Sequence, residues 1–559
     1  MGLAHAARLK GDDVVALAMV GDGGTSEGDF HEALNFAAVW QAPVVFLVQN
    51  NGFAISVPLA KQTAAPSLAH KAVGYGMPGR LVDGNDAAAV HEVLSDAVRH
   101  ARAGGGPTLV EAITYRVDAH TNADDATRYR GDAEVETWRE HDPIQLLERE
   151  LTERGLLDEA GKQAARDAAE AIGRRPARAH EPGPGARPHG PVRPRLRRAH
   201  TPTARATGPA AGRAGGRERV GGDAPMTTVA VKPATMAQAL TRALRDAMAA
   251  DPAVHVMGED VGTLGGVFRV TDGLAKEFGE DRCTDTPLAE AGILGTAVGM
   301  AMYGLRPVVE MQFDAFAYPA FEQLISHVSR MRNRTRGTMP LPITIRVPYG
   351  GGIGGVEHHS DSSEAYYMAT PGLHVVTPAT VADAYGLLRA AITSDDPVVF
   401  LEPKRLYWSK DSWNPEEPTP VEPIGRAVVR RSGRSATLIT YGPSVPVCME
   451  AAEAARAEGW DLEVVDLRSL VPFDDETVCA SVRRTGRAVV VHESGSFGGP
   501  GGEIAARVTE RCFHHLEAPV LRVAGFDVPY PPPMLERHHL PGVDRILDAV
   551  GRLQWEAES

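Results

Sequence analysis

A fifty-residue segment, 173–222, divides this chain, because its composition cannot build a folded core. The segment holds twelve Arg, eight Pro, ten Gly and nine Ala, but no Lys, no aromatic residue and only two acids. So few apolar side chains cannot offset the entropy lost on folding. We therefore predict a disordered linker over residues 173–225, with globular parts on either side. A basic RNA-binding arm is a second interpretation, although the aromatic side chains that stack on bases are absent.

The linker masks how acidic the rest of the chain is. The whole chain of 559 residues has a net charge of -14, and segment 173–222 contributes +10, so the remainder carries about -24. This balance argues against a generally basic, nucleic-acid-binding protein. No uncharged apolar stretch is long enough to cross a bilayer, and residues 1–10 lack the apolar core of a signal peptide. We expect a cytoplasmic protein that does not bind membranes.

The cysteines indicate neither a disulfide framework nor a zinc cluster. The four of them have no CxxC spacing, and they stand at Cys283, Cys448, Cys479 and Cys512. We interpret them as buried, small apolar side chains.

Apolar, β-rich runs alternate with helical patterns before the linker. Apolar residues recur at helical spacing in 28–40, and a second helix is predicted over 87–103. The predicted strands are residues 14–20, 44–48 and 108–115. Strands that alternate with helices are typical of a parallel α/β sheet.

The same alternation continues after the linker in two further blocks, separated by a proline-rich stretch near 415–423. The predicted strands are 254–257, 308–313 and 343–347 in the first block and 436–441, 462–467, 488–492 and 520–523 in the second. The predicted helices of the first block are 236–249, 292–303 and 319–332. We therefore predict the α/β fold class, with doubly wound parallel sheets in all three blocks.

Two polar motifs follow neighbouring predicted strands in the first block. Gly21-Asp22-Gly23-Gly24 follows one strand, and Asn50-Asn51-Gly52-Phe53 follows the next. Ligands bind at the carboxyl edge of an open parallel sheet, where both motifs are expected. Glycines allow a phosphate to approach the backbone, and the oxygens of Asp22 and Asn51 suit Mg2+. A GDG triplet alone is more commonly a simple turn.

The spacing of these motifs resembles that of thiamine-diphosphate enzymes. In that family an aspartate, the second asparagine and a backbone carbonyl two residues later hold Mg2+ on the cofactor. The resemblance implies that Asp22, Asn51 and Phe53 are the metal ligands here. It also implies that the glycines Gly21, Gly23 and Gly24 help to bind the cofactor.

Longer phrases narrow the resemblance to the decarboxylating component of 2-oxo acid dehydrogenase complexes. The first block is similar to its alpha subunit in GDGGTSEGDFHEALNFAAVW and VQNNGFAIS. The part after Met226 is similar to its beta subunit, nearly end to end, in MGEDVGTLGGVFRVTDGL, DTPLAEAGILGTAVG, EMQFDAFAYPAFEQL and YGGGIGGVEHHSDSSEAYY. The branched-chain member is the most similar, and the pyruvate member is an open alternative.

This resemblance implies domains, an activity and partners. Residues 1–172 would be a partial diphosphate-side domain, 226–424 the pyrimidine-side domain and 425–559 a transketolase C-terminal-like α/β domain. The activity would be oxidative decarboxylation of a 2-oxo acid of the 3-methyl-2-oxobutanoate type, with acyl transfer to lipoamide of a partner dihydrolipoamide acyltransferase. The expected cofactors are thiamine diphosphate and Mg2+. Two copies would imitate a two-alpha, two-beta assembly, with a separate full-length alpha subunit as a further expected partner.

Glu290 aligns with the family's glutamate that hydrogen-bonds the aminopyrimidine ring and activates the cofactor. Without the resemblance, a helix-capping interpretation would be preferred. In that alternative Thr286 caps a helix, Pro287 is its first residue, and Glu290 is an acid favoured by the helix dipole.

Three further positions match the lining of the aminopyrimidine pocket, and one matches a catalytic histidine. The resemblance implies that Leu288, Gln312 and Phe316 line the pocket, with Phe316 able to stack on the ring. His359 aligns with the histidine that donates a proton during acyl transfer. The alternatives are core packing for Phe316 and an ordinary surface loop for the His358-His359 pair.

The segment 115–125 resembles the alpha-subunit loop over the mouth of the active site. Within it, His120 aligns with the histidine that faces the cofactor, and we count it among the expected catalytic and cofactor-binding residues. Thr121 stands where some animal relatives carry a phosphorylated serine. The alternative for this acidic loop is solvated surface.

The resemblance fails upstream of the GDG motif. The family's alpha subunits extend much further, whereas only twenty residues precede Gly21. We therefore expect a shortened first domain with exposed apolar sheet edges. An out-of-frame origin in a GC-rich gene is a hypothesis for the linker composition. Two alternatives to the dehydrogenase remain: an impaired remnant with a role in assembly, and a transketolase-type enzyme.

Overall fold

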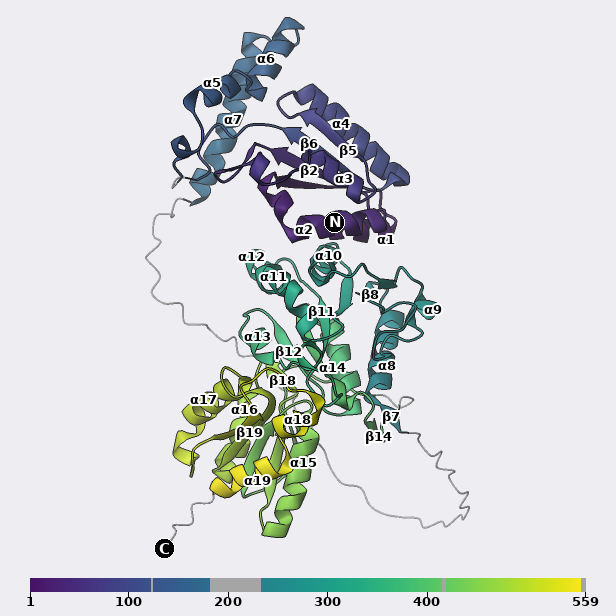
Figure 1. Ribbon diagram of the computed structural model, residues 1–559, viewed down its shortest axis with the longest axis vertical. Helices are drawn as coiled ribbons and strands as arrows, with labels where there is room; N and C mark the ends of the chain where they lie inside the picture. The colour runs from purple at the N-terminus through teal and green to yellow at the C-terminus, as the bar shows by residue number, and fades with distance from the viewer. Residues whose placement is uncertain (122–123, 181–232, 415–418, 554–559) are drawn as a thin grey trace, which may run out of the picture. The chain divides into compact units, whose positions relative to one another are not determined.

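The computed structural model describes residues 1–121, 124–180, 233–414 and 419–553 (Figure 1). The chain divides into two compact units, one of Met1–Glu140 with Val231–Ser559 and one of His141–Ala230. The described part of the second unit contains α6 (Pro143–Glu153) and α7 (Glu159–His180). Helix α7 continues past residue 173, where the linker was predicted to begin, and Ala and Arg, which are frequent in this stretch, favour helix. Residues 181–225 of the predicted linker lie outside the described residues.

The first sheet of the large unit is parallel and has the strand order β1-β2-β6-β5. Its strands are β1 (Ala16–Gly21), β2 (Val44–Asn50), β5 (Gly79–Asp83) and β6 (Thr108–Ile113). Around it lie α1 (Gly2–Lys10), α2 (Gly28–Val39), α3 (Lys71–Gly74), α4 (Ala87–His100) and α5 (Asp132–Arg139), with the short pair β3 (Phe53–Ala54) and β4 (Val57–Pro58). Side chains of α1 and α2 pack in one core and those of α4 in another, so helices cover both faces of the sheet.

The second sheet has seven strands in the order β18-β12-β13-β11-β10-β8-β9, and only β18 is antiparallel. The strands are β8 (Val254–Gly258), β9 (Cys283–Asp285), β10 (Arg306–Glu310), β11 (Thr344–Tyr349), β12 (His374–Val376), β13 (Val398–Pro403) and β18 (Ser469–Val471). The helices are α8 (Met236–Ala250), α9 (Leu274–Phe278), α10 (Glu290–Met302), α11 (Phe321–Gln323), α12 (Met331–Arg334), α13 (Glu364–Met368) and α14 (Val381–Thr393). A two-stranded ribbon joins β7 (Ala234–Thr235) to β14 (Lys410–Asp411).

The predicted continuous helix over residues 319–332 is wrong. The structure has a 3-10 turn at Ala315–Ala320, then α11, a wider π-turn at Leu324–Val328 and α12. Pro319 lies inside the 3-10 turn, where it has no N–H to donate to an α-helical hydrogen bond.

The third sheet has the order β15-β17-β16-β19-β20 and is parallel except for β15. Its strands are β15 (Val428–Arg431), β16 (Ala436–Thr440), β17 (Leu462–Asp466), β19 (Ala488–Gly495) and β20 (Leu521–Gly525). Its helices are α15 (Ser444–Ala455), α16 (Asp475–Thr485), α17 (Pro500–Cys512), α18 (Pro533–His539) and α19 (Val543–Arg552). The three sheets confirm the predicted α/β class with doubly wound parallel sheets.

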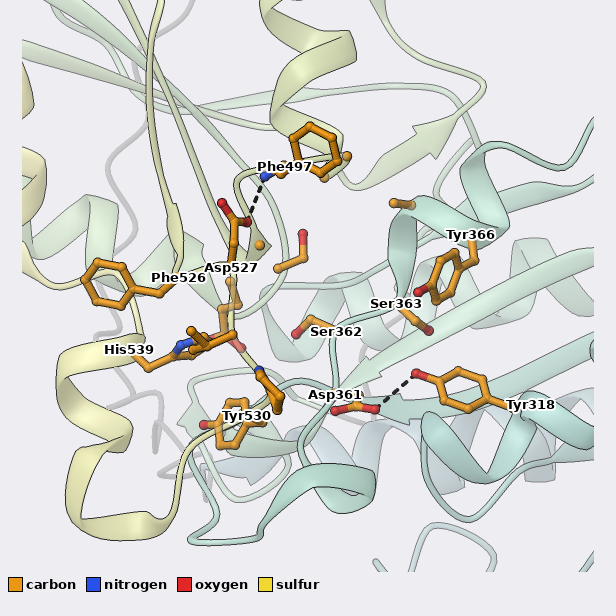
Figure 2. Close-up of a pocket in the computed structure, with 18 residues that line it drawn as sticks. Tyr318, Asp361, Ser362, Ser363, Tyr366, Phe497, Phe526, Asp527, Tyr530 and His539 are labelled. Atoms are coloured by element: carbon orange, nitrogen blue, oxygen red, sulfur yellow. Dashed lines mark hydrogen bonds between the residues drawn. The ribbon is translucent and has the colours of Figure 1, made fainter.

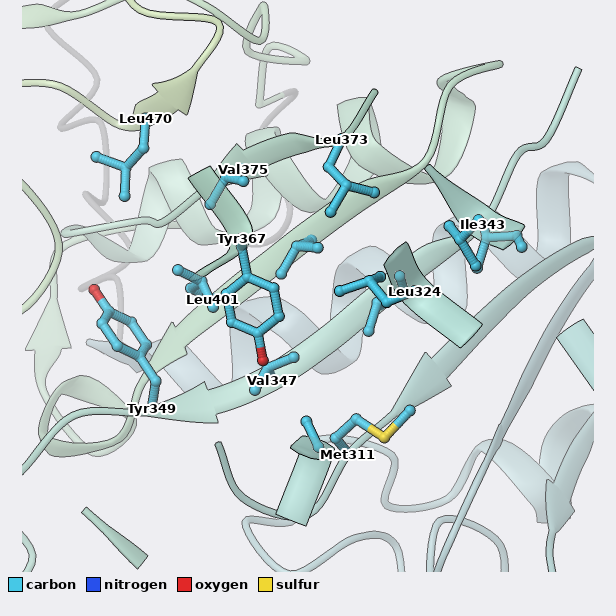
Figure 3. Packing of buried hydrophobic residues seen from close by; sticks show 14 of the residues in the cluster. Met311, Leu324, Ile343, Val347, Tyr349, Tyr367, Leu373, Val375, Leu401 and Leu470 are labelled. Carbon is cyan, nitrogen blue, oxygen red and sulfur yellow. The ribbon is translucent and has the colours of Figure 1, made fainter. Parts of the chain in front are cut away.

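The second and third blocks share one continuous core. Figure 3 shows Val347, Tyr367 and Leu401 of the second block packed in the same cluster as Leu470 of β18. All four cysteines are buried and free, as predicted. Among the helices of the described residues, none combines the length and the apolar character that a membrane crossing needs.

Candidate active site

The GDG motif leaves one buried carboxylate oxygen unpaired. Asp22 follows β1 directly and is 1% exposed. Its Oδ1 accepts a hydrogen bond from the backbone N–H of Asn51 at 3.3 Å. Its Oδ2 is buried and has no hydrogen-bond partner among the described residues. A buried anionic oxygen without a partner is costly, so this atom is suited to hold a cation.

The glycines of the motif lie in tight surroundings. A Cβ on Gly23 would come within 2.7 Å of the Ala54 Cβ, and one on Gly24 within 2.6 Å of a Val20 methyl group. A Cβ on Gly21 would meet nothing within 4 Å. Gly23 and Gly24 therefore keep the loop folded against β1 and β3, while Gly21 leaves open space beside Asp22.

The second motif follows β2, which pairs with β1 in parallel register. The Asn51 Oδ1 accepts a hydrogen bond from the Phe53 N–H at 3.1 Å, which fixes the turn. The Phe53 carbonyl accepts one from Arg116 at 3.4 Å. The structure thus brings Asp22, Asn51 and Phe53 to the same sheet edge. One carboxylate, one amide oxygen and one carbonyl form a hard-oxygen donor set that fits Mg2+.

Glu290 is the first residue of α10 and is 9% exposed. The residue that precedes it as N-cap is Ala289, so the alternative in which Thr286 caps this helix is wrong. The backbone turns into the helix only at Glu290, and the Thr286 hydroxyl is buried without a hydrogen-bond partner in the described structure. The carboxylate of Glu290 still benefits from the N-terminal end of the helix dipole.

Two further carboxyl groups stand near Glu290. Burial, together with the charges of Glu290 and Asp260, raises the pKa of Glu259 to about 7. Burial, Asp29 and Glu290 also raise the pKa of Glu32, which lies on α2. Like charges that share a poorly solvated site favour the protonated forms. Glu259 can therefore hold a proton close to neutral pH.

Helices α2 and α10 pack together, and this contact joins the two motif-bearing regions within the large unit. A Cβ on Gly292 would lie 2.9 Å from the Phe36 ring, so the helices approach closely. Gln323 also donates a hydrogen bond to Asp29 of α2 at 2.6 Å. This contact therefore joins α2, which follows the GDG loop, to α10, which begins at Glu290.

His359 lies in a 3-10 turn between two aromatic rings. Its ring meets Phe313 edge-on at 4.8 Å and Phe316 at 5.2 Å between centroids. The imidazole is exposed, so the two phenyl rings orient it without covering it. Gln312 donates to Asp260 at 3.2 Å. Phe316 therefore lies near His359, and Gln312 lies near Asp260.

Leu288 does not lie in an enclosed pocket, because 81% of its surface is exposed. His120 is also exposed, and its Nδ1 lies 3.4 Å from Arg116. The same guanidinium bonds the Phe53 carbonyl, so the loop that carries His120 is anchored beside the predicted metal ligands. Thr121, the predicted phosphorylation position, is described at the edge of a gap at residues 122–123.

Comparisons with known proteins identify the family of this chain. The family model "Dehydrogenase E1 component" matches residues 1–179. The pyrimidine binding domain of transketolase matches residues 232–409, and the transketolase C-terminal domain matches residues 425–546. The 3-methyl-2-oxobutanoate dehydrogenase subunit beta of Mycobacterium tuberculosis H37Rv is 56% identical over 320 residues, which are 57% of this chain and 91% of the relative. This chain belongs to the E1 family of 2-oxo acid dehydrogenases.

Other E1 relatives carry different substrate names. The pyruvate dehydrogenase E1 subunit beta of Leifsonia xyli is 52% identical and the 2-oxoisovalerate dehydrogenase subunit beta of Pseudomonas aeruginosa is 46% identical, each over 57% of this chain and 94% of the relative. A solved structure titled "Split gene transketolase, inactive beta4 tetramer" is 25% identical, covers 57% of this chain and 97% of its own, and has a TM-score of 0.47. In this E1 chain an alpha-like region is fused to a beta-like region, and its transketolase-like domains imply dependence on thiamine diphosphate.

Sequence reasoning missed three residues of this candidate site. Glu259 and Arg116 were not singled out, although each comes soon after a strand, β8 or β6, at a carboxyl edge. The strand-end rule that found Asp22 could have found them. Glu32 gave no such signal, since it lies in the middle of α2. Its place in the candidate site is evident only from the packing of α2 on α10.

Proposed function

We propose that this E1 chain catalyses the oxidative decarboxylation of a branched-chain 2-oxo acid of the 3-methyl-2-oxobutanoate type. The acyl group would pass to lipoamide on a partner dihydrolipoamide acyltransferase. One observation carries the proposal: α2, which follows the GDG loop, packs on α10, whose first residue is the nearly buried Glu290. The highest identity among the named relatives, 56% to a 3-methyl-2-oxobutanoate dehydrogenase, supports the branched-chain substrate.

The cofactor would bind between these two regions. Asp22, Asn51 and the Phe53 carbonyl would hold Mg2+ on the diphosphate, because Asp22 offers an unpaired buried oxygen. Open space at Gly21 leaves room for a phosphate beside the backbone. Bound thiamine diphosphate would supply a carbon nucleophile for the 2-oxo group and an electron sink for the loss of CO2.

The residues of the chain would position the cofactor and move protons. Glu290 would hold a proton at the aminopyrimidine ring, and the raised pKa of Glu259 provides a neighbour that stays protonated near pH 7. His359, oriented by Phe313 and Phe316, would donate a proton during acyl transfer to the lipoyl sulfur. In that transfer the lipoyl S–S bond would break as one sulfur bonds to the acyl carbon, which supplies the two electrons and is released from the cofactor, and the other sulfur would take the proton. His120 would face the cofactor from the loop that Arg116 anchors.

Two observations favour other candidates. The 52% identity to a pyruvate dehydrogenase subunit makes pyruvate the alternative substrate. The 81% exposure of Leu288, a predicted pocket residue, favours a site that a further chain completes. A second copy of this chain or a separate alpha subunit would fill that role. If such a site had no activity, the chain would function only in assembly. The domain limits at 172, 226 and 425 stay predictions within this proposal.

Calorimetric titration with thiamine diphosphate and MgCl2, followed by decarboxylation assays, tests the proposal. We expect binding that needs Mg2+, turnover of 2-oxoisovalerate in preference to pyruvate, and a loss of binding in Asp22→Asn. Glu290→Gln should keep the fold and the cofactor affinity within about threefold but lose at least ~100-fold in turnover, because proton transfer is worth about 10²–10⁴ in rate.

Three results would contradict parts of this assignment. A preference for pyruvate would replace the branched-chain substrate. Unchanged turnover in Glu290→Gln would remove Glu290 from the mechanism. An absence of binding and turnover, even after a full-length alpha subunit is added, would leave only the assembly function.

A further inference from the structure

A cavity of about 670 Å³ lies between the second and third blocks of the large unit. One wall comes from Tyr318 and residues 361–366, and the other from the loops after β19 and β20 and from α18. Figure 2 shows these side chains standing around a central space, with Tyr318 and Asp361 on one side and His539 and Phe526 on the other. The volume is that of a typical small-ligand pocket. None of the site residues predicted above lines it.

Aromatic rings form much of the cavity wall and remain accessible. Phe497 is 92% exposed, Tyr366 58% and Phe526 52%, and Tyr318 and Tyr530 complete the set. Exposed rings concentrated on one cavity are unusual, because single exposed aromatics normally scatter over a surface. The faces of such rings carry partial negative charge and attract cations. Arg545 already lies over the Phe526 ring, 4.6 Å from its centroid, so Phe526 supports the wall and does not receive a further cation.

Carboxylates stand among these rings. Asp361 accepts a hydrogen bond from the Tyr318 hydroxyl at 3.0 Å, and Asp527 accepts one from the Phe497 N–H at 2.8 Å. Neither has an ion-pair partner within the described residues. Glu493 also lines the cavity, but Arg405 neutralises it at 2.6 Å. Since no Lys or Arg lines the described wall, the cavity keeps a negative charge that disfavours anions.

His539 adds an unpaired polar group to this wall. It is 7% exposed, and its buried Nδ1 has no hydrogen-bond partner in the described part of the chain. Its ring meets Tyr530 edge-on at 5.2 Å. Burial lowers the pKa of His539, so the imidazole is neutral at pH 7 and one of its nitrogens can accept a hydrogen bond. The neutral imidazole therefore adds no positive charge to the cavity wall.

We propose that this cavity is a binding site for an organic cation that carries an alkylammonium or guanidinium group. The aromatic faces would receive the cation, and Asp361 and Asp527 would pair with its charge. The cation has two possible sources, a free small molecule or a Lys or Arg side chain that a partner protein inserts. Both have the same chemistry at the cavity, and the experiment distinguishes them.

Isothermal titration of the full chain with n-butylguanidinium tests the site, with neutral n-butylurea as the matched ligand. We expect butylguanidinium to bind at least about tenfold more tightly than butylurea. Phe497→Ala and Asp527→Asn should each weaken butylguanidinium by about tenfold. Phe497 is too exposed to contribute to folding, and asparagine retains the oxygen that accepts the Phe497 N–H, so neither change should unfold the chain.

Phe513→Ala and Asp548→Asn are matched controls, because both side chains are exposed on the third block away from the cavity. They should bind butylguanidinium as the unchanged chain does. The peptide acetyl-Gly-Arg-Gly-amide separates the two sources. Tighter binding of the peptide than of butylguanidinium supports an inserted side chain, and weaker binding supports a free small molecule.

Equal binding of butylurea, or unchanged affinity in both Phe497→Ala and Asp527→Asn, would overturn the proposal. So would an absence of any binding at roughly 10 mM ligand, a concentration that detects even millimolar affinity. Light scattering, which measures the oligomeric state, tests whether the exposed rings instead form a contact between copies of the chain. If the chain binds no cation and Phe497→Ala lowers its oligomeric state, the cavity is a contact between copies, and the cation site is refuted.

Discussion

Glu259 should make the large unit less stable as the pH rises through neutrality. Its carboxyl group is 7% exposed, and its Oε1 has no hydrogen-bond partner among the described atoms. Burial and the nearby Glu290 and Asp260 charges raise its pKa from 4.5 to about 7. Between pH 4.5 and 7 the folded chain therefore keeps a proton that the unfolded chain releases. Under these conditions the free energy of unfolding falls as the pH rises.

The size of the effect follows from the two pKa values. Each tenfold change in an acid dissociation constant is worth about 1.36 kcal/mol, so a rise from 4.5 to about 7 gives at most about 3 kcal/mol. Glu259→Gln cannot ionise and lacks this term. The variant should therefore gain up to about 3 kcal/mol over the unchanged chain between pH 4.5 and 8. For a domain of 150–250 residues this corresponds to a Tm difference of roughly 6–12 °C.

Thermal unfolding followed by circular dichroism at pH 5, 6, 7 and 8 measures this difference. Glu280→Gln is the matched control, because Glu280 is an exposed glutamate in the same block. Its Tm difference from the unchanged chain should be the same at every pH. If Glu259→Gln also shows a constant difference, Glu259 does not titrate near pH 7, and the reasoning from burial and repulsion is wrong.

Two further predictions concern a buried ion-pair cluster and a helix contact. Arg346→Met should destabilise the second block by about 3–5 kcal/mol, because it leaves Glu310 and Glu402 as buried, unpaired charges. Replacing both glutamates as well, with Glu310→Leu and Glu402→Leu, should recover much of the lost stability, as measured by thermal unfolding. Gly299→Ala should loosen α1 from α10, since the added Cβ would lie 2.7 Å from the Gly2 Cα, and hydrogen exchange of residues 2–10 should then rise. Gly295→Ala, whose Cβ meets nothing closer than 3.7 Å, should leave that exchange unchanged.

Most long elements could be predicted because their patterns are local. The apolar run 44–48 forms β2, and the helical period of 28–40 forms α2. The polar motifs that follow β1 and β2 lie at the expected edge of the sheet. Short elements could not be predicted in this way. β18 has three residues, and it forms only because β12 offers an edge that it can pair with. That pairing depends on residues almost a hundred positions away in the chain, and no local period reports it.

The candidate site shows the same division between local and distant information. Asp22, Asn51 and Glu290 could be predicted because motifs and a family resemblance mark them. Their surroundings could not be predicted, since burial and charge at one residue depend on elements far along the chain. Glu32 is one example, because burial raises its pKa most, and Asp29 on α2 and Glu290 on α10 add to the rise.

The sequence by itself determined the α/β class and the family, because these follow from periodicity and motif spacing. Only the tertiary structure decided which charged groups share a poorly solvated space. It placed Glu259 beside Glu290, left Leu288 open to solvent and gathered aromatic rings around Asp361 and Asp527. Solvation and Coulomb energies depend on distances through space, and a linear sequence does not contain those distances.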